Sequence, residues 1–155
     1  MPLFRDPHTR DLSAYEPEPV TVGYGADVVG RGDLGAQIVR IIARALREAQ
    51  GAGIPRAEVA RRMTEYLGRE VKTASLDKWV SAAAIEHRIP LDAFAALVHA
   101  TGQHDLLGHL PSLYGYAVVP ASYVDMIELQ QLEEHARKIA ERKANLQAKI
   151  KGGRR

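Results

Sequence analysis

The feature that most constrains this fold is a run of short segments in which apolar residues recur at helical spacing. Residues that start or stop helices stand at the ends of these segments: Asp33 and Pro55 begin two of them, Gly68 follows the one that Pro55 begins, and Gly102 follows a later one. Hydrophobic residues make up 46% of the chain but aromatic residues only 6%, so alanine-rich helices are expected to pack closely. The pattern predicts an all-α fold.

Six helices are expected from this pattern. They are predicted to cover residues 33–50, 55–67, 73–85, 91–101, 105–110 and 122–151. Thr73 is a suitable N-cap for the third helix, and Ser122 followed by Asp125 resembles a capping box for the last. The second and third helices are expected to turn inward Val59, Met63, Tyr66, Leu67, Leu76, Val80 and Ala83.

The chain is expected to have three parts. Residues 1–32 are predicted to be a flexible N-terminal arm, because prolines at 17 and 19 disfavour helix and glycines follow at 23, 25, 30 and 32. Residues 33–120 are predicted to form a compact helical domain. Residues 121–155 are predicted to form a long C-terminal oligomerisation helix with a basic tail.

The second and third helices have the order expected of a helix-turn-helix. In that motif one helix braces a second, whose exposed face enters the DNA major groove. Small Ala60 permits close approach of the bracing helix, and the helix after Thr73 is the expected recognition helix. The candidate DNA-binding residues are Arg56, Arg69, Lys72, Thr73, Ser75, Lys78 and Trp79.

These residues have different expected roles. Lys78 and Ser75 can donate hydrogen bonds to base edges or phosphate, whereas the arginines and Lys72 are placed to contact phosphates without reading sequence. The alternative is that the cations only solvate the surface and that Trp79 completes the core. Glu70 and Asp77 weaken the local positive field, and the connection between the helices is longer than a standard tight turn.

Several short motifs carry a family resemblance. They are Arg-Ala-Glu-Val-Ala-Arg-Arg-Met at 56–63, Leu-Asp-Lys-Trp at 76–79, Arg-Ile-Pro-Leu at 88–91, Ala-Thr-Gly at 100–102, and leucines at 106, 107 and 110. Over about residues 53–120 the chain resembles phage regulatory proteins of the CII type and related proteins of transposable phages. The resemblance implies phage or prophage DNA regulation, with recognition by residues 73–81. The N-terminal arm and the long C-terminal helix depart from that family.

The C-terminal segment predicts self-association. Leu132, Ile139 and Leu146 recur every seven residues, which is the repeat of a coiled-coil seam. Nearby helix faces carry Ile127, Ala136 and Ile150, whereas the expected second core position holds His135, Arg142 and Lys149. We expect a homo-oligomer, because a helix this long needs a partner for its apolar edge. The alternative is a helix that lies along its own domain.

Composition argues against several other classes. The chain has no cysteine, which excludes disulfides, zinc fingers and a thiol nucleophile, and no cofactor is expected. Histidines 99, 104 and 109 are five residues apart, so they are expected at the surface or at caps rather than around a metal. No secretion signal or membrane span is evident, and a cytoplasmic location is expected. No catalytic motif is found, so we do not expect an enzyme.

Three functional hypotheses follow. The first is a phage-type regulator that binds duplex DNA as an oligomer. The second is a phage assembly component, such as a small terminase-like DNA-recognition subunit. The third is an adaptor for a phage or host protein with no nucleic-acid role, which the balance of 21 basic and 19 acidic residues favours.

Overall fold

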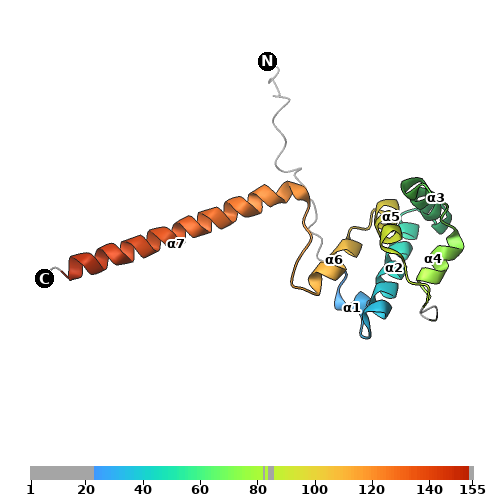
Figure 1. Ribbon diagram of the computed structural model, residues 1–155, viewed down its shortest axis with the longest axis horizontal. Helices are drawn as coiled ribbons and strands as arrows, with labels where there is room; N and C mark the ends of the chain where they lie inside the picture. The colour runs from blue at the N-terminus through green and yellow to red at the C-terminus, as the bar shows by residue number, and fades with distance from the viewer. Residues whose placement is uncertain (1–22, 82, 84–85, 154–155) are drawn as a thin grey trace, which may run out of the picture. The chain divides into compact units, whose positions relative to one another are not determined.

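The computed structural model describes residues 23–81, 83 and 86–153, and over these residues the chain is all-helical, as predicted (Figure 1). No strand occurs among the described residues. The elements in chain order are α1 (Ala26–Val29), α2 (Leu34–Gly51), α3 (Arg56–Leu67), α4 (Thr73–Trp79), α5 (Leu91–Thr101), α6 (Asp105–Ser112), the 3-10 helix η2 (Ala121–Tyr123) and α7 (Val124–Gly152). Within these described ranges, no helix is both long and apolar enough to span a bilayer.

The stop and start residues act as the sequence predicts at most helix ends. The Asp33 carboxylate caps α2 by accepting a hydrogen bond from the Ala36 amide at 2.8 Å. Gly68 and Gly102 end α3 and α5 in the left-handed conformation, with φ of 64° and 69°. At these two positions glycine avoids the steric cost that a Cβ would bring.

Some of the boundaries expected for α4 and α6 are wrong. The α4 helix ends at Trp79 instead of residue 85, because the Ser81 amide donates to the Lys78 carbonyl three residues back, and the α-helical hydrogen-bond pattern stops there. Residues 82, 84 and 85 lie outside the described residues. The N-cap of α4 is Lys72, and Thr73 is its first residue. The α6 helix continues through Pro111, whose missing N–H disturbs little so near the end of the helix.

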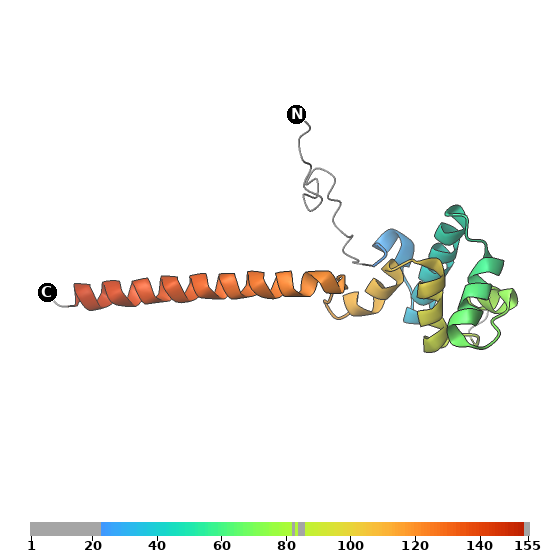
Figure 2. The ribbon, with the colours of Figure 1, turned by 90° about the horizontal axis from the view of Figure 1, so that it is seen from above.

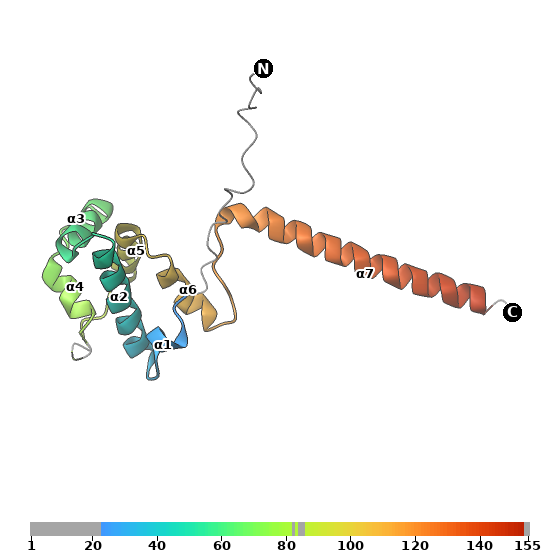
Figure 3. The same ribbon diagram turned by 180° about the vertical axis from the view of Figure 1, so that it is seen from behind.

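The core lies where α2, α3 and α5 meet, and alanines make the close contact possible. The α2 helix contributes Ile41, Ile42, Ala45, Leu46 and Ala49; α3 contributes Val59, Ala60 and Met63; and α5 contributes Ala93, Ala96, Leu97 and Ala100. Figure 3 shows α1 beside the N-terminal end of α2, and α5 nearer to its C-terminal end. Small side chains let the helix axes approach, so the isoleucines, leucines and Met63 fill the remaining space.

Two residues expected in the core lie outside it. Tyr66 is 53% exposed and stacks on His99 with ring centroids 4.6 Å apart, so its apolar ring covers the seam between α3 and α5 while its hydroxyl stays near water. Ala83 is exposed as well. The predicted inward positions Val59, Met63 and Leu76 are confirmed as buried.

The arm was expected to extend to residue 32, but the residues from Gly23 onward belong to the helical domain. The Tyr24 hydroxyl donates to the Glu48 carboxylate at 3.0 Å, and Val28 and Val29 pack against the core. The Arg40 guanidinium on α2 donates to the Arg31 carbonyl at 2.6 Å. The four-residue helix α1 therefore closes one side of α2. The rest of the expected arm, residues 1–22, lies outside the described residues.

The α7 helix belongs to a separate unit of the structure, which begins at residue 119. It is 29 residues long, and Figure 2 shows it as one unbroken helix. At 1.5 Å per residue its length is about 43 Å. It begins at Val124, after Tyr123 at the N-cap, rather than at the expected Ser122. None of its residues is buried.

A pair of methionine substitutions tests this division into buried core and exposed helix. We expect Met63→Ala to lower the free energy of unfolding by about 2–5 kcal/mol, because Met63 is fully buried and its loss leaves a cavity. Met126→Ala on α7, where the side chain is 62% exposed, should change it by less than about 0.5 kcal/mol. Urea denaturation followed by circular dichroism measures both; equal losses would contradict the assignment of the core.

Candidate nucleic-acid interface

The connection between α3 and α4 is fixed by hydrogen bonds on the side chain of Thr64. The Thr64 hydroxyl accepts from the Val71 amide at 2.9 Å and donates to the Ala60 carbonyl at 2.9 Å. Val71 is buried, and so is Leu76 one turn into α4. The five-residue connection is longer than a standard tight turn, but these contacts hold α4 against α3 in a defined orientation.

The outer face of α4 is short and mixed in charge. Thr73, Asp77 and Lys78 are exposed, together with Lys72 just before the helix. Ser75 is only half-buried, so its hydroxyl remains near the surface. Trp79 is also half-buried and packs against the core cluster. This placement fits the alternative interpretation, in which Trp79 completes the core. A partner that approaches α4 would therefore meet two lysines, one aspartate and small polar groups.

Acidic neighbours neutralise most of the predicted phosphate-binding cations. Arg56 at the start of α3 pairs with Asp77 on α4, and the Arg69 guanidinium pairs with the Asp92 carboxylate on α5 at 2.7 Å. The hydrogen bond from Arg69 holds the pKa of Asp92 below its usual value, so the Asp92 carboxylate is charged at neutral pH.

The two lysines are less constrained. Lys72 lies 3.9 Å from a carboxylate oxygen of Glu70, which is the limit of an ion pair. Lys78 has no ion pair with any described residue. It is therefore the predicted cation whose charge is most available to an anionic partner.

The basic and acidic side chains on the exposed face of α3 also neutralise one another. Arg61 and Arg62 both donate to the Glu58 carboxylate, at 2.7 and 2.8 Å, and Arg61 also pairs with Glu65. The hydrogen bonds from Arg61 and then Arg62 lower the pKa of Glu58 to about 2. These pairs are exposed, so each adds little to stability, but together they remove net charge from the bracing helix.

The predicted oligomerisation residues form an uncovered stripe on α7. Leu132 is 60% exposed, Ile139 55% and Leu146 46%. Beside this stripe, Lys138 forms an ion pair with Glu134, with 2.8 Å between the charged atoms. A helix of this length with no buried residue has its apolar stripe available to a partner.

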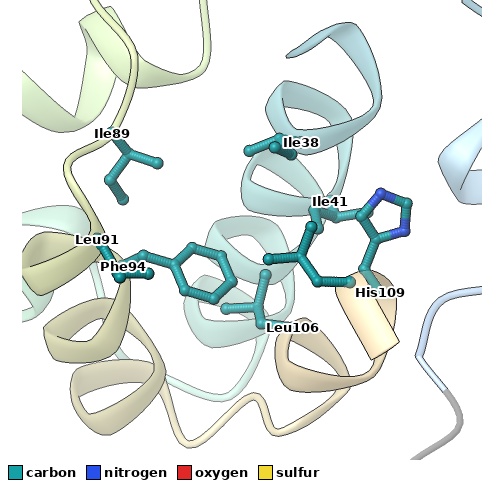
Figure 4. Close-up of a pocket in the computed structure, with 8 residues that line it drawn as sticks. Ile38, Ile41, Ile89, Leu91, Phe94, Leu106 and His109 are labelled. Atoms are coloured by element: carbon teal, nitrogen blue, oxygen red, sulfur yellow. The ribbon is translucent and has the colours of Figure 1, made fainter. Parts of the chain in front are cut away.

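A small apolar cavity lies elsewhere in the helical domain, between α2, α5 and α6 (Figure 4). Its volume is about 130 Å³, and Ile38, Ile41, Ile89, Leu91, Phe94, Leu106, His109 and Leu110 line it. Sites for organic ligands usually have roughly 300–1,000 Å³ and several converging polar groups. This cavity has one ionisable side chain, His109, so its composition does not indicate a substrate site.

His109 was expected at the surface, but it is 3% exposed. Figure 4 shows its imidazole extending from α6 toward Ile41 on α2. Its Nε2 atom has no hydrogen-bond partner among the described residues, and burial lowers the pKa of the ring. Local spacing did not predict this burial, because only the register of α6 places His109 on the same face as buried Leu106.

The other histidines do not converge with it. His99 stacks on Tyr66, and His104 is exposed at the start of α6. Within the described ranges no three side chains of the types that bind metals gather at one place.

The comparisons give no family. No protein-family model matches the chain, and no curated protein or solved structure matches it significantly.

The free energy of unfolding at acidic pH should depend on His109. Its pKa is lowered in the folded chain, so the unfolded chain binds the proton more readily, and the stability from neutral His109 is lost as the pH falls below about 6.5. We expect His109→Leu to flatten the decline in unfolding free energy between pH 7 and pH 5. His104→Leu, at an exposed position, is the control. An unchanged decline in His109→Leu would show that the buried ring does not cause it.

Proposed function

We propose that this protein is a phage-type DNA-binding regulator that contacts duplex DNA through α4 and acts as an oligomer through α7. The observation that carries the proposal is the fixed placement of α4. Leu76 and the Thr64–Val71 hydrogen bond hold its inner side, and Thr73 and Lys78 stay exposed on its outer side. A helix-turn-helix needs a recognition helix of this kind, with one side packed against its domain and the other side exposed to DNA. The resemblance of residues 53–120 to CII-type regulators supports the same function.

The electrostatics suggest how such a protein would bind. Residues 53–80 contain six basic and four acidic side chains, a net charge of only +2. Because non-specific affinity comes mainly from neutralising phosphates, a single copy should bind duplex DNA weakly. Two or more copies on one duplex would add their contacts, so oligomerisation is an integral part of the proposal.

An adaptor without a nucleic-acid role is the second candidate. The observation that favours it is the neutralisation of Arg56 and Arg69 by Asp77 and Asp92, because an adaptor surface does not need free cations. The two candidates predict different results when one of these acidic residues is removed: the regulator gains affinity for duplex DNA, and the adaptor does not.

Asp77→Asn provides that test. The substitution removes a negative charge from the face of α4 and releases the Arg56 guanidinium, so we expect duplex affinity to rise about three- to tenfold at 0.1 M salt. Fluorescence anisotropy with a labelled random-sequence duplex measures the change. Asp125→Asn on α7 is the matched control with the same charge change. A gain cannot arise from misfolding; equal affinities for the two variants would remove α4 from the interface.

The lysines give the complementary prediction. Lys72→Ala together with Lys78→Ala should weaken duplex binding and lower the slope of log affinity against log salt by about 2, one unit for each lost phosphate contact. Lys138→Ala, whose ammonium group pairs with Glu134 on α7, is the single-site control and should change the slope by less than the double variant does. A slope equal to that of the wild type in the double variant would reject these lysines as phosphate contacts.

Oligomerisation has its own test. We expect Ile139→Lys to reduce the mass measured by light scattering to that of one chain, because it places a charge in the proposed seam. Ile139 is 55% exposed in the single chain, so the domain core should not be affected. Ala148→Lys, nearly opposite on the same helix, should leave the mass unchanged. If the wild type itself has the mass of one chain, the oligomer is excluded.

A further inference from the structure

The apolar stripe of α7 is longer than the three leucine and isoleucine layers alone suggest. Leu129, Leu132, Ile139, Leu146 and Ile150 are all between 46% and 62% exposed. With 3.6 residues per turn, these five side chains fall within about 100° of arc around the helix. A stripe of this width suits one partner helix rather than a broad domain surface.

The stripe follows a heptad register that differs from the one expected from the sequence. The core positions lie alternately three and four residues apart, at Leu129, Leu132, Ala136, Ile139, Lys143, Leu146 and Ile150. His135 and Arg142, which were expected in the core, become residues that flank it. The seam then contains one charged layer, at Lys143, instead of three.

The charges beside this seam change sign along the helix. From residue 124 to 141 there are five acidic and two basic side chains; from 142 to 153 there are four basic and none acidic. Among the described residues, the ion pair within α7 is Lys138–Glu134. Glu128 near one end of the helix and Lys149 near the other have no ion-pair partner in the described part of the chain. Both of these residues occupy the g position of the heptad, which borders the partner helix.

We propose that α7 pairs with α7 of a second copy of this chain, and that the two helices run antiparallel. The proposal deepens the oligomerisation part of the proposed function by naming the partner and its direction. In an antiparallel pair the g positions of the two helices face one another. Glu128 of each copy then lies beside Lys149 of the other, and Leu129 packs against Leu146 of the other copy.

A parallel pair has the opposite electrostatics. It would place Lys143 against Lys143 in the core and Glu128 beside Glu133 of the second copy, so like charges would meet at both places. In the antiparallel pair Lys143 packs against Leu132 and is level with Glu133 of the second copy. The charge pattern therefore distinguishes the two directions, although the apolar positions alone would allow either.

The direction has a structural consequence. The first residues of the two α7 helices lie at opposite ends of the pair, about 40 Å apart at 1.5 Å per residue. The two chains consequently enter the pair from opposite ends rather than from one end.

Single cysteines test the direction, because the natural chain contains none. Leu129→Cys and Leu146→Cys are prepared as full-length chains, each alone and as an equimolar mixture that has been allowed to exchange subunits. Facing core positions in a coiled coil are close enough for a disulfide. After mild oxidation we expect little cross-linking in either single sample and a disulfide dimer in the mixture. Ala148→Cys, on the outer face, should give no dimer when mixed with either variant.

Each other outcome overturns the proposal. Strong cross-linking of Leu129→Cys and Leu146→Cys with themselves indicates a parallel pair. No cross-link in any sample, while light scattering shows the mass of two chains, indicates a different interface. A mass of one chain, or of more than two, excludes the pair as proposed. The cross-linking is read without DNA, so its failure is separate from a failure of duplex binding by α4.

Discussion

The packing of α3 onto α5 is the constraint on which the candidate interface depends. Alanines at the contact let these two helices approach closely, and Met63 and Leu97 fill the space between them. Because α3 is fixed in this way, the Thr64–Val71 hydrogen bond and buried Leu76 can fix α4 in turn. The exposed face of α4 thus gains a defined orientation from a core that contains few aromatic residues.

Charge pairing sets the strength of any interaction made by this face. Arg56 and Arg69 reach acidic partners on neighbouring helices, so they help to hold α3, α4 and α5 together as much as they add positive potential. Lys78 is the predicted cation without such a partner in the described chain. A protein built in this way would gain affinity by presenting several copies of a weak surface, which is the purpose that we assign to α7.

The sequence predicted the helices well where local chemistry decides their ends. Asp33, Gly68 and Gly102 act through their own side-chain or backbone properties, so their positions could be read directly. The prediction from sequence failed where tertiary contacts determine which residues are ordered and packed. The packing of residues 23–32 on α2 depends on contacts of Tyr24 with Glu48 and of Arg40 with a distant carbonyl. The candidate site residues lie on the helices and the connection where the sequence predicted them. Their ion pairs could not be predicted, because each joins residues that are more than 20 positions apart in the chain.

The most direct test of the central claim is the salt dependence of duplex binding by the unmodified protein. We predict that the logarithm of the association constant falls linearly with the logarithm of the salt concentration, with a slope that counts the phosphates contacted by all copies in the oligomer. Binding that is absent at low salt, or that does not change with salt, would contradict the claim that this chain recognises DNA.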